Sequence, residues 1–215
     1  MQAEFWHERW QTNDIGFHEN QPNEQLLAHF QRLQLQPGQR IFIPLCGKTC
    51  DIDWLLSQGL QVAGAELHEA AVEEMFARLK LTPEVSQQGK LRHYRAQHID
   101  IYVGDIFDLT PALLGPVDAI YDRAALVALP ESMRGDYVYQ LLTLSKAAPQ
   151  LLLCYEYDEQ QLQGPPFSIN RQEVLRHYQA IYQCDNLQRQ FIPGGLKAQV
   201  DATASAWLLS PQLAK

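Results

Sequence analysis

The sequence predicts an α/β fold: one doubly wound, mostly parallel sheet of seven strands that ends in a C-terminal antiparallel hairpin. Five short apolar runs alternate with segments of helical periodicity between residues 40 and 158, and this alternation is typical of parallel α/β sheets. The rhythm changes at Gly164-Pro165-Pro166, which requires a loop. Two strand-like runs follow, near residues 186–192 and 202–209, and they predict the hairpin.

The parallel strands are predicted from the five apolar runs, at residues 40–45, 60–65, 99–103, 117–121 and 150–158. Each run is followed by a segment that can cross back over the sheet, so that consecutive strands lie parallel. In such sheets, ligands bind beyond the carboxyl ends of the strands. The residues that end these runs are therefore the first candidates for a functional site.

Helices are predicted between the strands, from apolar residues at helical spacing. Asn23 is a suitable N-cap for the first one, and Asn170 with Glu173 three positions on resembles a capping box for the last. The others cover residues 51–58, 69–80 and roughly 131–147. Residues 83–92, with Gln87-Gln88-Gly89 at the tip, are expected to form a polar excursion.

Composition indicates a globular protein in one domain, residues 1–215, with residues 1–23 as an aromatic N-terminal segment that forms a helix and a lid. Hydrophobic residues make up 46% of the chain, and the formal net charge is −8. That charge argues against nucleic acid or an anionic membrane as the main partner. The sequence shows neither a signal-peptide core nor the ~20 apolar residues of a membrane span. We expect a cytoplasmic monomer.

The four cysteines are expected to be reduced residues of a cytoplasmic protein. Cys46 and Cys50 are the closest pair, but they lack the two-residue gap of zinc and redox motifs. No histidine pair completes a site. The sequence therefore predicts no metal.

The turn after the first strand raises the question of a phosphate site, because Gly47-Lys48-Thr49 resembles the end of a P-loop. A P-loop needs another glycine five positions before this Gly-Lys pair, and the chain has Phe42 there. The dinucleotide fingerprint Gly-x-Gly-x-x-Gly is also absent. What remains is a tight strand-to-helix turn that can approach a ligand without cradling a pyrophosphate.

Acidic residues follow two other predicted strands. Glu66 ends the second strand and could accept hydrogen bonds from ribose hydroxyls, although it could equally cap the next helix. Asp105 and Ile106 follow the third strand and could address an adenine, or could form an ordinary turn. Together with the turn at Gly47, these positions fit an adenosine without phosphate. S-adenosylmethionine fits better than NAD or ATP, since a sulfonium needs no anion cradle and favours acids and aromatic faces.

The sequence resembles the bacterial thiopurine S-methyltransferase family over essentially its whole length. This resemblance implies a class I, Rossmann-like methyltransferase that uses S-adenosyl-L-methionine as methyl donor. The stretches 83–97 and 193–201 match less clearly. The motifs that carry the resemblance are FWHERWQTNDIGFHENQPN at 5–23, PLCGKTCDIDWL at 44–55, VAGAEL at 62–67, GDIFDL at 104–109, YDRAALVALP at 121–130 and GPPFS at 164–168.

The resemblance also implies roles for individual residues. Those expected at the cofactor are Trp10, Leu45 through its backbone, Glu66 on the ribose, Asp105 and Ile106 at the adenine, and Arg123 near the methionine end. Arg123 is also the expected catalytic residue, since it could orient an anionic acceptor or polarise a heterocycle. Phe17 and the loop that begins at Pro165 are expected to line the acceptor pocket. Phe5 and Trp6 are expected to pack on the core.

The implied reaction is an in-line displacement in which a thiol or thiolate sulfur takes the methyl group, for which a strong general base is optional. Asp122 is a poor base for a thiol and is expected to be structural. Three alternatives stay open: selenium or tellurium compounds or aliphatic thiols as acceptors, a non-catalytic S-adenosylmethionine-binding protein, and an ATP-dependent enzyme, which the turn disfavours.

Overall fold

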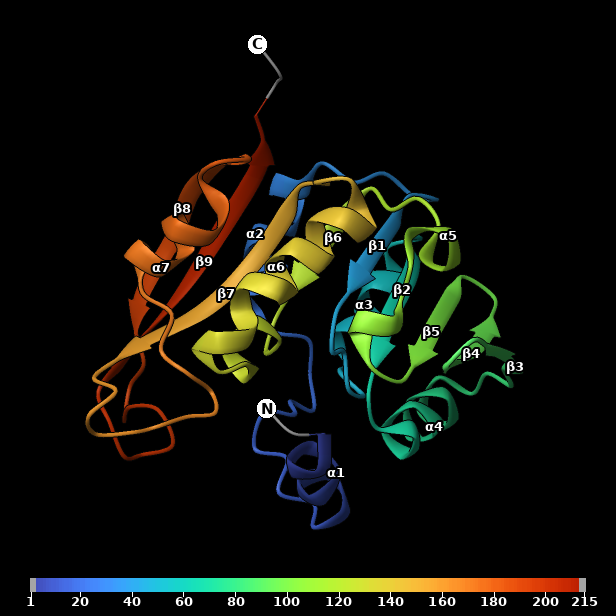
Figure 1. Cartoon of the computed structure of the whole chain (residues 1–215), viewed down its shortest axis with the longest axis horizontal. Helices are drawn as coiled ribbons and strands as arrows, with labels where there is room; N and C mark the ends of the chain where they lie inside the picture. The colour runs from blue at the N-terminus through green and yellow to red at the C-terminus, as the bar shows by residue number, and fades with distance from the viewer. Residues whose placement is uncertain (1–2, 213–215) are drawn as a thin grey trace.

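The computed structural model describes residues 3–212. Its centre is one mixed sheet of nine strands, in the order β3-β4-β5-β2-β1-β6-β7-β9-β8 (Figure 1). The strands are β1 (Arg40–Ile43), β2 (Gln61–Glu66), β3 (Glu84–Gln88), β4 (Leu91–Ala96), β5 (Ile99–Val103), β6 (Ala119–Asp122), β7 (Gln150–Tyr157), β8 (Tyr182–Phe191) and β9 (Ala202–Pro211).

The parallel part of the sheet confirms the five predicted strands: β5, β2, β1, β6 and β7 are adjacent and parallel. The strand β9 then pairs antiparallel with β7, and β8 pairs with β9, as predicted for the C-terminal hairpin. The strand order reverses at β1, since the chain moves outward through β2 on one side and β6 on the other. That reversal places the expected ligand crevice over β1.

The prediction of seven strands is wrong, because the stretch expected to be a polar excursion forms the antiparallel hairpin β3–β4 at the sheet edge. Its turn contains Gly89, at a φ of 63°. The hairpin lacks the usual signal of alternating apolar residues. In β4 the buried side chains are Leu91 and Tyr94, three positions apart, and β3 has none. An edge strand with one exposed face can be polar in this way.

Helices cover both faces of the sheet. On one face lie α2 (Glu24–His29), α3 (Asp51–Ser57) and α4 (Glu69–Leu79), which bury Leu26, Leu55 and Met75 in one apolar cluster. On the other lie α5 (Pro111–Leu114), α6 (Glu131–Ser145) and α7 (Arg171–Tyr178), which bury Leu141 and Val174 in a second cluster. Short 3₁₀ helices form at Phe30–Leu33, Ile106–Asp108 and Leu126–Ala128.

The two predicted helix caps are confirmed. The side chain of Asn23 accepts a hydrogen bond from the backbone N–H of Gln25 at 3.0 Å. The side chain of Asn170 accepts one from the backbone N–H of Glu173, also at 3.0 Å. Both bonds satisfy N–H groups that lack an intrahelical partner.

The first helix, α1 (Ala3–Gln11), lies apart from the two helix layers, beyond the carboxyl ends of the central strands (Figure 1). It has no buried residue, so the expectation that Phe5 and Trp6 pack on the core is wrong. Instead, the Trp6 ring meets the rings of Phe5 and Phe17 edge to face, with centroids 5.2 and 5.7 Å apart. The aromatic residues of α1 thus pack against the segment that follows the helix rather than against the core.

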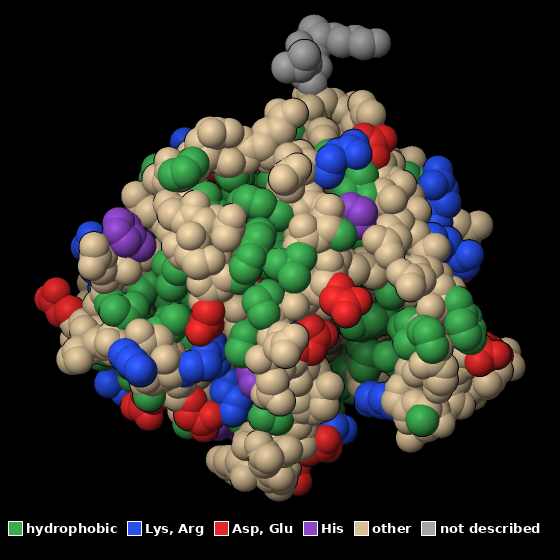
Figure 2. Space-filling model, turned by 180° about the vertical axis from the view of Figure 1, so that it is seen from behind, with side chains coloured by type: hydrophobic (Ala, Val, Ile, Leu, Met, Phe, Trp, Pro, Cys, Tyr) green, Lys and Arg blue, Asp and Glu red, His purple; other side chains and the backbone are tan. Residues whose placement is uncertain are grey.

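Between residues 3 and 212, no helix combines the length and apolar character needed to span a membrane. On the face seen in Figure 2, Lys and Arg side chains are interspersed with Asp and Glu side chains.

Candidate functional site

A cavity of about 550 Å³ opens at the carboxyl ends of β1, β2, β5 and β6. This is the crevice that the reversal of strand order predicts. The structure brings every predicted site residue to its lining: Trp10, Phe17, Leu45, Glu66, Asp105, Ile106, Arg123 and Pro165.

The floor of the cavity is the turn between β1 and α3. Leu45 and Gly47 both have a positive φ, of 46° and 52°, which is uncommon for leucine. A Cβ on Gly47 would lie 3.0 Å from the Trp10 ring. Glycine is thus required here both for its backbone conformation and for the close approach of the indole. Backbone strain of this kind concentrates at functional sites.

Glu66 is buried beside this turn, with 6% of its surface exposed. Its carboxylate accepts hydrogen bonds from the backbone N–H groups of Gly47, at 2.7 Å, and His68, at 2.8 Å. Burial raises the pKa of Glu66 and the backbone N–H groups oppose that shift. The alternative that Glu66 caps the next helix is wrong, since the N-cap residue of α4 is His68 and no side chain caps that helix. Glu66 instead braces the local backbone, and because a carboxylate has about four acceptor positions, it can still accept hydrogen bonds from a ligand.

Trp10 closes one side of the cavity. Its ring stacks on that of His68 with centroids 5.7 Å apart and meets the Phe17 ring edge to face at 5.3 Å. The Lys48 ammonium lies 5.6 Å from the Trp10 ring centroid. His7 and His68 are also joined, through Nδ1 atoms 3.1 Å apart. These contacts hold α1 against the strand ends.

Asp105 and Ile106 follow β5 as predicted. The Asp105 side chain accepts a hydrogen bond from the backbone N–H of Phe107 at 3.0 Å and caps the short helix there. Asp105 is exposed at the cavity, whereas Ile106 is 5% exposed. The pair therefore offers a polar group beside an apolar surface.

Arg123 follows β6, and its side chain is 9% exposed. One terminal nitrogen lies 2.5 Å from a carboxylate oxygen of Glu19 and donates to the carbonyl of Phe17 at 3.2 Å. The other lies 3.7 Å from a carboxylate oxygen of Asp51. Its Nε is buried and has no hydrogen-bond partner among the residues described. Arg123 is thus a buried cation with one donor unused.

Asp51 is a central site residue that the sequence analysis treated only as the start of a helix. It is 1% exposed and accepts hydrogen bonds from the backbone N–H of Asn23 at 2.7 Å, from Thr49 Oγ1 at 3.0 Å and from the Tyr121 hydroxyl at 3.1 Å. It therefore ties the N-terminal segment, the turn after β1 and the end of β6 together. An acid placed directly after the turn was the signal for it.

Asp122 points away from the cavity lining, into the core, where it is fully buried. It accepts hydrogen bonds from the Tyr137 hydroxyl at 2.8 Å and the backbone N–H of Leu126 at 3.1 Å. Burial raises its pKa to about 6. These contacts fit the structural role expected for it.

The loop with Pro165 forms the far wall. The backbone N–H of Phe167 donates to the carbonyl of Val127 at 2.6 Å, and the Arg134 guanidinium lies 5.4 Å from the Phe167 ring centroid. Lys197, from the loop between β8 and β9, donates to the carbonyl of Pro165 at 2.7 Å. Lys197 and Glu19 also line the cavity, and the sequence analysis missed both.

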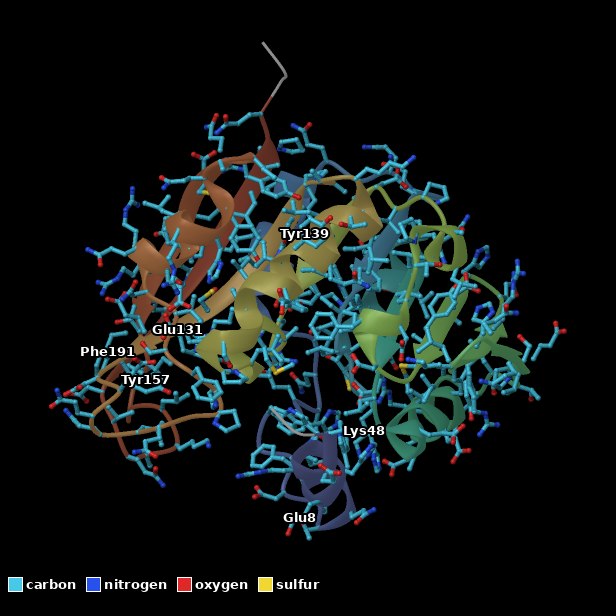
Figure 3. The ribbon with its side chains drawn as sticks, viewed as in Figure 1. Glu8, Lys48, Glu131, Tyr139, Tyr157 and Phe191 are labelled. Carbon is cyan, nitrogen blue, oxygen red and sulfur yellow. The ribbon has the colours of Figure 1, made fainter. Side chains whose placement is uncertain are left out.

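The groups that would hold phosphate in a P-loop all have carboxylate partners. The Gly47 N–H donates to Glu66, Lys48 Nζ lies 2.5 Å from a Glu74 oxygen, and Thr49 Oγ1 donates to Asp51. Figure 3 shows Lys48 between α1 and α4. The donors of this turn are therefore already bound to carboxylates of the protein and are not free to bind a phosphate.

The described residues contain no group of three or more His, Cys, Asp or Glu side chains that could hold a metal ion. The four cysteines, which all lie within the described part of the chain, are unpaired.

This chain matches thiopurine S-methyltransferases over nearly its whole length, and it matches solved methyltransferase structures in fold. The family model described as Thiopurine S-methyltransferase (TPMT) matches residues 1–205. The thiopurine S-methyltransferase of Xanthobacter autotrophicus is 53% identical over 97% of this chain and 99% of its own, and that of Teredinibacter turnerae is 50% identical over 98% of each. Among solved structures, the 1,6-didemethyltoxoflavin-N1-methyltransferase of Burkholderia thailandensis, with bound S-adenosylhomocysteine, superposes with a TM-score of 0.62 at 13% identity. That superposition covers 97% of this chain and 87% of the other.

Proposed function

The chain belongs to the thiopurine S-methyltransferase family, and we propose that it transfers the methyl group of S-adenosyl-L-methionine to the sulfur of thiopurines and of other aromatic or heterocyclic thiols. The observation that carries this proposal is the pairing of two buried groups over neighbouring strands. Glu66 ends β2 and Arg123 follows β6, on either side of β1, and both line one cavity. One group suits a ribose and the other an electron-rich acceptor.

In this proposal, the donor lies over β1, β2 and β5. Glu66 accepts hydrogen bonds from the ribose hydroxyls, Leu45 contacts the donor through its backbone, and Trp10 covers it. Asp105 and Ile106 flank the adenine. The residues fit a ligand that carries a cation and no phosphate, because acids and an aromatic face surround the turn. When bound, S-adenosylmethionine supplies an electrophilic methyl group on a sulfonium.

The acceptor lies between Phe17, Arg123 and Pro165. Phe17 offers a ring face, and the guanidinium of Arg123, which lines the cavity, can donate to the sulfur or a ring nitrogen. Alignment of the two reactants accounts for most of the acceleration, for which oriented reactants gain up to ~7–11 kcal/mol. Exclusion of water by the N-terminal segment adds to this effect.

We place this activity in a cytoplasmic monomer whose partners are small molecules, with neither nucleic acid nor membrane involved. The unpaired cysteines support a reducing compartment, and the net charge of −8 disfavours polyanionic partners.

The proposal is tested with methyl-labelled S-adenosylmethionine and a panel of acceptors: thiopurines, aromatic thiols, aliphatic thiols, selenite and tellurite. We expect label on the sulfur of the aromatic and heterocyclic thiols. Label only on selenium or tellurium products, or only on aliphatic thiols, would replace the proposed acceptor class. Binding of S-adenosylhomocysteine by calorimetry, without turnover of any acceptor, would identify a binding protein instead.

A further inference from the structure

The acceptor end of the cavity carries one more negative charge than its buried cation requires. Arg123 faces two carboxylates, with Glu19 at 2.5 Å and Asp51 at 3.7 Å. Asp51 is 1% exposed and is fixed by the hydrogen bonds described above. It therefore serves as the permanent counterion, and Glu19 is the second one.

Glu19 differs from Asp51 in being held by a loop rather than by the core. Its side chain is 42% exposed. Both of its carboxylate oxygens lie near the side-chain nitrogen of Asn23, at 3.1 and 3.3 Å. Asn23 in turn uses its side-chain oxygen to cap α2 and its backbone N–H to bind Asp51. Glu19 is thus positioned at the cavity but can be displaced into solvent.

Other cations that line the cavity are occupied as well. Arg9 pairs with Asp14 at 2.5 Å, Lys48 pairs with Glu74 at 2.5 Å, and Lys197 donates to the Pro165 carbonyl. Arg9 and Lys48 are thus neutralised by carboxylates, whereas Lys197 has only a neutral carbonyl as its described partner. An anionic acceptor that binds at the buried cation, Arg123, has to displace Glu19, whereas a neutral thiol or thione does not.

We propose that Glu19 is a specificity-determining residue that favours acceptors entering as the neutral thiol or thione and disfavours acceptors that are already anionic. The proton of such a thiol, or of the ring nitrogen of a thione, is released to solvent as the sulfur takes the methyl group and the donor sulfonium becomes a neutral thioether. This inference rests on the proposed function and defines the charge state of its substrate. Discrimination here comes from a repulsive element, a common device for specificity. The other titratable groups near the pair are Asp51, Tyr121, Tyr155 and His18. Burial raises the pKa of both tyrosines, so they stay neutral, and it lowers the pKa of the histidine, which favours the neutral imidazole.

The test compares two acceptors of similar shape at pH 6: thiophenol, which is mostly neutral, and pentafluorothiophenol, which is ionised. Their dissociation constants are measured by calorimetry on enzyme saturated with S-adenosylhomocysteine, so that the readout does not depend on turnover. Glu19→Gln keeps a hydrogen-bond acceptor for Arg123 and removes only the charge. We expect this variant to bind pentafluorothiophenol about tenfold more tightly than wild type, the order of effect for one partly exposed neighbouring charge. We expect thiophenol binding to change less than twofold.

The matched control is Glu8→Gln, which makes the same change of charge on the exposed side of α1, away from the cavity lining (Figure 3). It should leave both constants unchanged. An unchanged melting temperature and S-adenosylhomocysteine affinity would show that Glu19→Gln is folded.

Equal changes for the two acceptors, or no gain for the ionised one, would overturn the role of Glu19. Turnover of thiophenol by the wild-type enzyme is measured alongside. If the wild type methylates thiophenol but the two constants do not diverge in the variant, the specificity proposal fails and the proposed function stands. If the wild type methylates no thiol at all, the proposed function fails, and this inference fails with it.

Discussion

Replacing Asp122 with Asn changes the stability of the protein in a pH-dependent way that follows from burial alone. Asp122 is fully buried, accepts two hydrogen bonds, and has its pKa raised from the ordinary 3.8 to about 6. The folded state therefore holds a proton that the unfolded state has lost between about pH 4 and pH 6. Over that window the free energy of unfolding falls as pH rises, because the native state binds more protons there.

The size of the effect follows from the difference between the two pKa values. A shift of about two units, at 1.36 kcal/mol per unit, corresponds to ~3 kcal/mol in total. About half of this, ~1.4 kcal/mol, falls between pH 7.5 and pH 5. Asn is neutral at every pH and can still accept the Leu126 N–H, so Asp122→Asn removes this dependence. Relative to the variant, wild type should gain ~1.4 kcal/mol of stability on going from pH 7.5 to pH 5.

The assay is urea unfolding of both proteins at pH 7.5 and pH 5, since the difference between them cancels the titration of all other groups. The raised pKa also makes Asp122→Asn as stable as wild type, or more stable, at pH 7.5. A difference that stays constant with pH would refute the reasoning and would mean that Asp122 ionises in the folded state as it does in the unfolded chain.

Further predictions concern the proposed site. Glu66→Gln should weaken S-adenosylhomocysteine binding by about 1–3 kcal/mol through lost charge-assisted hydrogen bonds. It should also lower the melting temperature, because Glu66 accepts hydrogen bonds from the Gly47 and His68 N–H groups. An unchanged dissociation constant in calorimetry would show that Glu66 does not bind the cofactor. Arg123→Ala should reduce turnover of thiols far more than S-adenosylhomocysteine affinity, and full turnover in a folded variant would exclude the assigned role. Hydrogen exchange of residues 10–23 should slow on adding S-adenosylhomocysteine and slow further with an aromatic ligand. Phe17→Ala should raise the Michaelis constant for aromatic thiols more than for small ones. Equal hydrogen exchange with and without ligand, together with unchanged kinetics in Phe17→Ala, would show that the segment only packs on the protein and does not close over the ligand.

The sequence was sufficient for the parallel core because its strands are buried and apolar. These runs contrast with the amphipathic helices between them, and alternation of the two predicts the topology. The hairpin β3–β4 was not predicted, because its buried residues Leu91 and Tyr94 are three positions apart, which breaks the alternation typical of a strand, and its other side chains are not buried. The prediction for Phe5 and Trp6 was wrong because large apolar rings favour burial in the core, whereas α1 lies outside both helix layers and buries none of its residues.

The site residues that could be predicted from the sequence are those whose position follows from the topology of the sheet. Residues that end parallel strands meet at one edge of the sheet, and the resemblance assigned roles to the same positions. Glu19 could not be found this way, because its partner Arg123 is distant in sequence and the loop that carries Glu19 has no hydrophobic periodicity. Asp51 was hidden for a related reason: an acid in the first turn of a helix is common, and only the packed structure shows the Tyr121 hydroxyl and the Asn23 N–H directed at it.

The central claim is that one cavity holds the donor over Glu66 and the acceptor beside Arg123. A crystal structure of the protein with S-adenosylhomocysteine and 6-mercaptopurine tests this directly. We expect the ribose hydroxyls on the Glu66 carboxylate, the adenine beside Ile106, and the purine sulfur facing the homocysteine sulfur within reach of Arg123. A ribose bound elsewhere, or a purine held away from Arg123, would contradict the account.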